Sequence, residues 1–293
     1  MKKLLFVMNP CAGMRKANKL LPEILGLFNR HGYDVHVHIT EGRADAQAVV
    51  ASRGAEMDLV VCCGGDGTFN ETVSGILQSG AKTPVGYIPA GSTNDFAVSL
   101  GLKSSPLEAA KAIMEGQETQ YDVGCFGGRY FTYVASFGIF TKASYATPQS
   151  MKNTLGHAAY VLEGIQELSQ LRKYPVKMEL DGEVLEGEYL FGAISNSTSM
   201  GGVLKLDPKQ VDMADGLFEI LLVRMPKDLL ELSDCINAIQ KQNYNCKMMT
   251  FRTAKKVTVH AQMGMDWTLD GEREPGHEQI EVENIHLAIT LKK

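Results

Sequence analysis

A strand-like run that passes directly into a glycine-rich turn and then into a helix-like run is the feature that most constrains this chain. Residues 60–77 read VVCCGGDGTFNETVSGIL. Adjacent glycines weaken a strand, so chains keep them where the backbone makes a special turn or lets a ligand approach closely. The following helix, which Thr68 can cap, directs free N–H groups and its positive dipole end at the turn. The stretch therefore predicts a loop that binds a nucleotide phosphate.

Strand and helix patterns alternate over residues 1–120, which predicts βαβ units and a parallel sheet. Short apolar or alternating runs indicate strands at 3–8, 34–39, 58–63 and 85–88. Apolar residues repeat at helical spacing in 15–29 and in 68–78, where Phe69, Val73 and Ile76 share one face. Open α/β folds bind ligands at the carboxyl ends of their strands, where the glycine-rich turn lies. We expect a three-layer, nucleotide-binding α/β domain here.

The pattern changes near residue 121, where glycines, aromatic residues and alternating runs replace the strand–helix alternation. One such run, VKMELDGEVLEGEYLFGAISN, reads as a hairpin with Asp181-Gly182 in its turn. Helical patterns interrupt these runs at about 154–171 and 226–243. We expect a β-rich, sandwich-like second domain over residues 121–283, with a strand at about 284–293 that returns to the first domain.

Composition excludes several classes of protein. The 293 residues are 44% hydrophobic and 22% charged, as in an ordinary globular protein. The net charge of −5 argues against a nucleic-acid partner, and six cysteines without a CxxC pair argue against a disulfide scaffold or a zinc site. No run of about 18 apolar residues could span a bilayer. We expect a cytoplasmic protein whose contact with a membrane is transient and peripheral.

Two more loops belong to the same predicted sheet edge. MNPCAG (8–13) follows the first strand, and VGYIPAGSTNDFA (85–97) repeats the order strand, glycine, hydroxyl residues and helix. MNPCAG matches neither the Walker A nor the GxGxxG pattern, so this is not an ordinary P-loop or dinucleotide fold. A carboxylate such as Asp66 repels phosphates unless a cation lies between them, which suggests magnesium. A capping Asp explains an isolated GGDG equally well, but three such loops at one edge favour a phosphate site.

These motifs resemble the diacylglycerol kinase catalytic family, of the bacterial soluble type, which is related to sphingosine and ceramide kinases. The resemblance covers nearly the whole chain, because it extends from NPCAG, GGDGT and PAGSTNDFA through YDVG (121–124), LGHAAYVLEGI (155–165), VDMADGLFEILLV (211–223) and LDGE (269–272). GGDGT alone is shared with NAD kinases and, loosely, with phosphofructokinases, whereas the combination is specific. It implies an NAD-kinase- or phosphofructokinase-like first domain and an ATP- and Mg²⁺-dependent lipid kinase that converts diacylglycerol to phosphatidic acid.

The resemblance also implies individual site residues. ATP contacts are expected at Asn9, Pro10, Cys11, Ala12, Gly13, Thr40, Gly64, Gly65, Asp66, Gly67, Thr68, Phe69, Asn70, Ser92, Thr93 and Asn94. The family usually has Thr where this chain has Ser92, but the hydroxyl is kept. Asp66, Asp95 and Asp122 are similar to acidic positions that organise the catalytic magnesium and its waters. Asp212, Asp215 and the main-chain carbonyl of Leu217 resemble a second, structural magnesium site.

Glu272 matches the proposed catalytic base of the family, with Asp66 as the second catalytic carboxylate. A glutamate brought to the cleft as a general base would contribute roughly 10²–10⁴-fold to the rate. LDGE occurs twice, at 180–183 and at 269–272. From the residues alone both copies could be plain hairpin turns, and only the resemblance assigns a role to the later one.

Two other functions stay open at this point. An NAD kinase-like enzyme shares GGDGT and the two-domain plan, and a catalytically silent regulator could bind nucleotide or lipid without turnover. The joint presence of Asp66, Asp95, Asp122 and Glu272 argues against the regulator. The expected partner is a lipid substrate at the membrane surface, with a homodimer as a further expectation.

Overall fold

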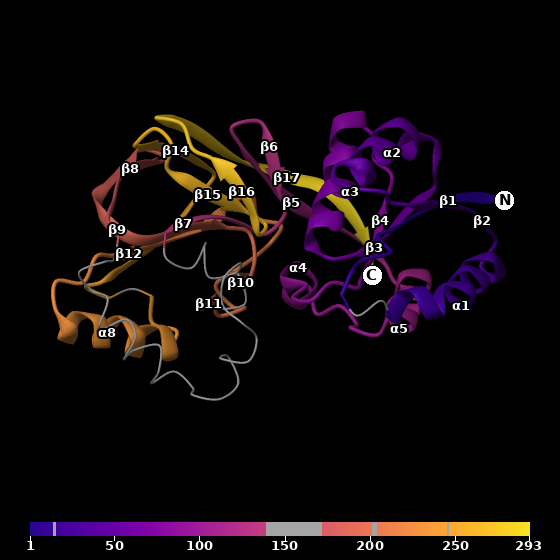
Figure 1. The fold of residues 1–293 in the computed structure, drawn as a ribbon, viewed down its shortest axis with the longest axis horizontal. Coiled ribbons are helices and arrows are strands. Elements are labelled where there is room, and N and C mark those ends of the chain that lie inside the picture. Colours follow the sequence, from indigo (N-terminus) through magenta and orange to yellow (C-terminus); the bar gives the residue numbers. More distant parts are fainter. Residues whose placement is uncertain (14–15, 139–171, 201–203, 245) are drawn as a thin grey trace.

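The structure, a computed structural model, describes residues 1–13, 16–138, 172–200, 204–244 and 246–293, and it has two halves that lie side by side (Figure 1). The first half is built on four parallel strands in the order β4-β3-β1-β2. These strands are β1 (Lys2–Met8), β2 (Tyr33–Ile39), β3 (Leu59–Gly64) and β4 (Val85–Pro89). The predicted strands are therefore confirmed to within a residue or two at each end.

Helices cover both faces of this parallel sheet, which makes the predicted three layers. Alternate residues of β1 explain how: Leu4 and Phe6 pack into one buried cluster and Leu5 and Val7 into another, as the two-residue period of a strand requires. The helices are α1 (Lys16–Arg30) and α5 (Pro106–Glu115) in contact with each other, α2 (Asp45–Arg53) against α3 (Asp66–Ser79), and the short η1 (Gly54–Glu56) and α4 (Asp95–Ser99).

The helix after the glycine-rich turn begins two residues earlier than the sequence pattern indicated. The N-cap of α3 is Gly65, which has no side chain that could cap the helix. The prediction that Thr68 caps the helix is wrong, because Thr68 lies inside the first turns, where it is buried. Asp66 is consequently the first residue of the helix, so its position in the turn is fixed by helical geometry.

The second half is rich in β-structure, as expected. Its strands are β5 (Glu118–Phe126), β6 (Arg129–Phe131), β7 (Val134–Gly138), β8 (Tyr174–Leu180), β9 (Glu183–Ser195), β10 (Ser199–Met200), β11 (Leu204–Lys205), β12 (Phe218–Arg224), β13 (Met249–Ala254), β14 (Lys256–Ala261), β15 (Asp266–Leu269) and β16 (Glu272–Pro275). Phe137 and Trp267 pack edge to face in its core. The helix predicted at 226–243 is α8 (Leu229–Gln240), capped by the Asp228 side chain, and the one predicted at 154–171 lies outside the described residues.

One long strand joins the two halves. β17 (Gln279–Lys292) pairs with β14 and β5 of the second half, and near its end Leu291 pairs in parallel with Val85 of β4. A single path of paired strands therefore runs through both halves. A division into two domains near residue 120 stays a prediction. No helix in the described ranges is long and apolar enough to cross a membrane.

Two helical glycines offer a test of how closely the layers pack. A Cβ on Gly75 of α3 would lie 2.7 Å from the Gln47 carbonyl oxygen of α2, whereas a Cβ on Gly26 of α1 would meet only the end of the Arg30 side chain at 3.4 Å. We expect Gly75→Ala to lower the free energy of unfolding by about 1–3 kcal/mol through overpacking. Gly26→Ala should raise it by roughly 0.5–1 kcal/mol, because alanine is the better helix former. Urea unfolding of both variants tests this; equal effects would contradict the close contact of α2 and α3.

Candidate active site

Three glycine-containing loops meet at the carboxyl edge of the parallel sheet. A Cβ on Gly91 would lie only 2.6 Å from the Cα of Gly65, and a Cβ on Gly13, whose φ is +50°, would lie 2.3 Å from the carbonyl oxygen of Ala90. The N–H of Ala90 donates to the carbonyl of Gly64 at 2.7 Å. Only residues without a Cβ allow this approach. The structure therefore brings together the loops that the sequence placed at one edge.

Side chains of the predicted nucleotide loops are tied to one another. The Asn9 side-chain amide nitrogen donates to the Thr68 hydroxyl at 3.1 Å, and the Asn9 side-chain oxygen Oδ1 accepts from the N–H of Cys11 at 2.9 Å. Asn94, in the left-handed conformation, bonds both polar groups of Gly91 at 2.9 Å. These bonds hold the first and third loops in shape before any ligand arrives.

The remaining predicted ATP contacts divide into two groups. Those with exposed or half-buried side chains at the sheet edge are Pro10, Cys11, Ala12, Thr40, Ser92 and Thr93. Phe69 is different, because its ring is fully buried and stacks on Tyr87 and Phe96 at centroid distances of 4.3 and 5.0 Å. The Phe69 side chain therefore belongs to the core, and a contact with ATP could come only from its backbone.

Two carboxylates lie together beside these loops. Asp66 accepts hydrogen bonds from the N–H groups of Asp95 and Phe96, at 3.1 and 3.4 Å. Asp95 is buried and accepts from the Ser199 hydroxyl at 2.6 Å. Burial, and after it the charges of Asp95 and Asp270, raise the pKa of Asp66 to about 7. The two carboxylates therefore repel each other, and a cation bound beside them would relieve that repulsion.

Asp122, the third predicted acid, is bound elsewhere in the fold. Its carboxylate is fully buried and accepts from the N–H groups of Gly216 and Leu287, both at 2.7 Å, and pairs with His286 at 3.0 Å. Within the described ranges, no group of three or more Asp, Glu, His and Cys side chains is arranged to hold a metal ion. A place for Asp122 in a magnesium network stays a prediction.

The residues of the second predicted magnesium site form a compact turn. Asp212 and Asp215 each accept from a backbone N–H two residues on, at 3.0 and 2.9 Å, and the carbonyl of Leu217 accepts from the Asn284 amide at 3.0 Å. Burial first, and then the charges of these acids, raise the pKa of the nearby Glu219 to about 8. Two carboxylates and a carbonyl are oxygen ligands of the kind Mg²⁺ takes, and the site stays a prediction.

The second half carries Glu272 to the glycine-rich turn. Glu272 begins β16, directly after the hairpin turn at Asp270-Gly271. A Cβ on Gly67, in the first turn of α3, would lie 3.6 Å from Oε1 of Glu272. The carboxylate and the predicted phosphate loop are therefore neighbours in space although about 200 residues separate them in the chain.

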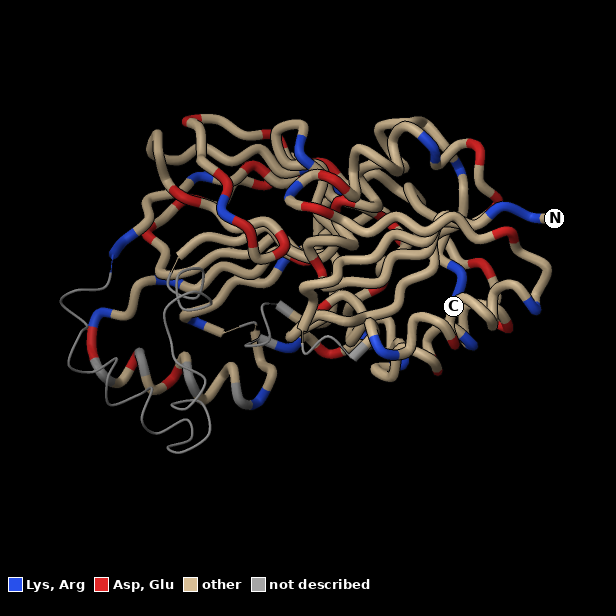
Figure 2. The backbone as a smooth tube through the Cα atoms, turned by 45° about the vertical axis from the view of Figure 1, so that its right-hand side comes forward, with Lys and Arg blue, Asp and Glu red and all other residues tan. Residues whose placement is uncertain are grey.

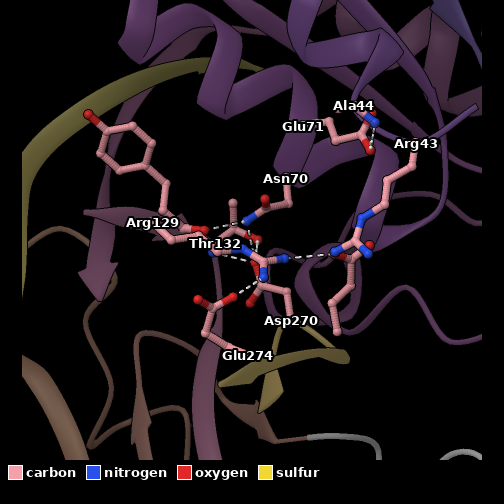
Figure 3. Close-up of polar contacts among 10 residues, drawn as sticks. Arg43, Ala44, Asn70, Glu71, Arg129, Thr132, Asp270 and Glu274 are labelled. Carbon is pink, nitrogen blue, oxygen red and sulfur yellow. Dashed lines mark hydrogen bonds and ion pairs between the residues drawn. The ribbon is translucent and has the colours of Figure 1, made fainter. Parts of the chain in front are cut away.

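A buried aspartate holds this hairpin against the first half (Figure 3). Asp270 accepts from the N–H groups of Thr132, Tyr133 and Val134, at 2.5, 3.0 and 3.0 Å, and from the Asn70 amide at 2.8 Å. Asn70 also donates to the carbonyl of Tyr130 at 3.1 Å. The side chain of Asn70, expected to contact ATP, thus joins the two halves through its amide nitrogen, a role that sequence reasoning missed.

Acidic and basic positions gather where the halves meet (Figure 2). Oε2 of Glu272 accepts from Arg43 at 2.8 Å and from Arg129 at 2.7 Å, and Arg129 also pairs with Glu274. A cavity of about 470 Å³ opens beside them, lined by Arg43, Gln47, Glu71, Arg129, Tyr130 and Glu272 among others. Sequence reasoning did not single out either arginine, since nothing local marks a pairing over more than 140 residues.

A parallel sheet with three glycine loops at its edge, completed by a carboxylate from a β-rich second half, defines a two-lobed phosphoryl-transfer enzyme. The family model of the diacylglycerol kinase catalytic domain matches residues 3–126, and that of the YegS C-terminal NAD kinase beta sandwich-like domain matches residues 134–289. The second match agrees with the β-rich half described above.

Comparison with individual proteins also indicates the diacylglycerol kinase family. The chain is 32% identical to a diacylglycerol kinase of Bacillus subtilis (strain 168) over 274 residues, which are 93% of this chain and 90% of the relative. It is 31% identical to a diacylglycerol kinase of Staphylococcus carnosus, over 92% of this chain and 89% of the relative. A solved structure from Bacillus anthracis str. Sterne that carries the same name matches with a TM-score of 0.82 and 25% identity, over 99% and 95% of the two chains. The chain belongs to the diacylglycerol kinase family and is a lipid kinase.

The raised pKa of Asp66 predicts a pH-dependent stability. The pKa of Asp66 is about 7 in the folded state, whereas in the unfolded chain it lies at its ordinary value of 3.8. The folded state therefore binds more protons between these values, and stability falls as the pH rises through that window. Asp66→Asn removes this loss, so its melting temperature should exceed that of the parent protein by more at pH 8 than at pH 5. Thermal unfolding without nucleotide or divalent cation measures this, and a gain that is constant with pH would contradict it.

The two LDGE copies provide a matched pair of variants. Both form left-handed turns, with φ of 45° at Asp181 and 49° at Asp270, and both aspartates accept backbone N–H groups from another segment. Only Asp270 is buried and bonded to α3. Asp270→Asn should lower the free energy of unfolding by about 2–4 kcal/mol, because buried donors lose a charged acceptor. Asp181→Asn should cost a small fraction of that in urea unfolding; equal costs would mean that the contact with α3 adds nothing.

Proposed function

We propose that the chain transfers the γ-phosphoryl group of Mg-ATP to the hydroxyl of diacylglycerol and so forms phosphatidic acid. The observation that carries the proposal is the position of Glu272, whose Oε1 lies beside Gly67 at the start of α3. A carboxylate at that point can take the proton of a hydroxyl that attacks a phosphate bound by the turn. The curated relatives named diacylglycerol kinase support the choice of acceptor.

The glycine loops and the N-terminus of α3 would bind the nucleotide phosphates. Gly64, Gly65 and Gly91 let the backbone approach, and the first N–H groups of the 14-residue helix α3 have no partner in the preceding turn. Membership of a kinase family implies ATP as the phosphate donor. The turn would hold the phosphates in line with the acceptor, which is most of what phosphoryl transfer requires.

Asp66 and Asp95 fit a magnesium ion shared with the nucleotide. Mg²⁺ usually binds through one or two carboxylates together with substrate phosphates, which is what this pair offers. Asp95 contributes to the raised pKa of Asp66, a repulsion that a bound cation would relieve. When bound, the ion would neutralise charge on the phosphate oxygens. Ser199 would keep the Asp95 carboxylate in place through its 2.6 Å hydrogen bond.

The acceptor reaches the site from a membrane. Diacylglycerol resides in a bilayer, so we propose that the protein meets its substrate at the membrane surface as a peripheral protein. The net charge of −5 does not favour anionic membranes, so attachment would need a local basic or apolar patch.

Transfer of labelled γ-phosphate from Mg-ATP tests the proposal. Diacylglycerol, ceramide, sphingosine and monoacylglycerol in mixed micelles serve as acceptors, with NAD as an aqueous competitor. We expect label in phosphatidic acid and a loss of roughly 10²–10⁴-fold with Glu272→Gln, since the general base is removed. Glu183→Gln, in the other LDGE copy, is the matched control and should keep its activity.

The outcomes separate the alternatives. Label in NADP would identify an NAD kinase-like enzyme, and label in another lipid would change the acceptor while keeping the reaction. ATP binding without transfer to any acceptor would indicate a silent regulator. Full activity of Glu272→Gln would show that Glu272 is not the general base.

A further inference from the structure

Two guanidinium groups from different halves of the molecule converge on one carboxylate oxygen (Figure 3). Arg43 lies in the loop between β2 and α2, and Arg129 begins β6. They donate to Oε2 of Glu272 at 2.8 and 2.7 Å, while Oε1 faces Gly67 at the N-terminal turn of α3. Two cations and a positive helix end thus surround one anion.

The two guanidinium groups and the helix N-terminus match a phosphoryl group better than they match a carboxylate. Arginine presents several N–H donors in a planar fork, which matches the oxygens of a phosphate, and a phosphoryl group carries more charge and more acceptor oxygens than Glu272 does. The adjoining cavity of about 470 Å³ is large enough for a group of this size. Glu272 occupies the place in which an oxyanion of a ligand would be bound.

The contact occupies one oxygen of the proposed general base. A base needs an oxygen free to accept the hydroxyl proton, and Oε2 already accepts from two arginines. The Arg43 side chain is 72% exposed and that of Glu272 37%, and ion pairs so exposed to water stabilise a protein little. An arriving dianion can therefore displace Glu272 at small cost.

We infer that Arg43 and Arg129 form the binding site of the phosphoryl group that is transferred, and that this group displaces the Glu272 carboxylate from them. The inference rests on the proposed function. The acceptor oxygen forms a bond to the γ-phosphorus, the bond from that phosphorus to the bridging oxygen of ADP breaks, and the hydroxyl proton passes to the freed oxygen of Glu272. Base and phosphate site thus become active together.

The two arginines differ in how firmly they are held. Arg129 is 30% exposed and is shared between Glu272 and Glu274, so it keeps one carboxylate partner when Glu272 leaves. Arg43 reaches the site from an exposed loop. Arg129 is therefore the fixed part of the site, and Arg43 is the part that closes on the ligand.

Calorimetric binding to the full-length protein without lipid acceptor tests the inference. The probes are Mg-ATP, Mg-ADP and a short-chain phosphatidic acid below its micelle concentration. Arg43→Ala and Arg129→Ala are compared with Arg273→Ala, a matched control that is 73% exposed and pairs with Asp266 at 2.8 Å. Arg129→Lys keeps the charge in case Arg129→Ala does not fold, which circular dichroism would reveal.

We expect both arginine variants to bind Mg-ATP about tenfold more weakly while binding Mg-ADP as before, because each loses a charge-assisted contact to the γ-phosphate. Weaker binding of phosphatidic acid alone would support the same site with the phosphate of the lipid product as its ligand. Unchanged affinity for all three probes, or an equal loss in Arg273→Ala, would overturn the inference. The calorimetry measures binding and not transfer. Failure to phosphorylate any lipid would therefore contradict the proposed function but would leave the binding result unchanged.

Discussion

The buried carboxylate of Asp270 is the interaction on which the candidate site depends. It binds three consecutive N–H groups of residues 132–134 and the amide of Asn70 in α3. Asn70 lies one helical turn after Asp66, so the bond orients the whole first turn of α3 relative to the second half. Glu272 follows Asp270 by two residues, and its approach to Gly67 is a consequence of that bond.

The pairing of β17 with strands of both halves is a second constraint on the position of Asp270 relative to α3. β17 pairs along its length with β14 and β5 and ends beside β4, so backbone hydrogen bonds continue across the junction. Sites built on paired strands and helices hold their geometry better than sites built on loops. The second half therefore carries the Glu272 carboxylate to the glycine-rich turn of the first half, while Arg43 lies in an exposed loop.

Features that depend on residues close together in the chain could be predicted from the sequence, whereas contacts between distant residues could not. The strands of the first half, the turn at Gly64-Gly65 and α8 depend on local patterns, and the structure bears them out. The helical pattern places Phe69 on an apolar face, and its stacked ring agrees with that pattern, so an ATP contact through the backbone of Phe69 stays a prediction. Arg43 meets Glu272 across 229 residues, and a single sequence carries no signal for such a pair.

The two LDGE copies show that a local sequence predicts a turn but not the segment that the turn packs against. Both adopt the same left-handed turn, and both aspartates anchor it through backbone N–H groups, so the tetrapeptide encodes a hairpin and nothing more. The difference comes from the partner: the Asp181 turn stays exposed, whereas the Asp270 turn is buried against α3. The Asp270 carboxylate is thereby a contact between the halves, and Glu272, two residues further on, lies at the predicted phosphate loop. The position of Glu272 beside Gly67 is thus set by topology. The same residue in the same turn at Glu183 pairs only with the partly exposed Arg252 among the ion pairs of the described residues.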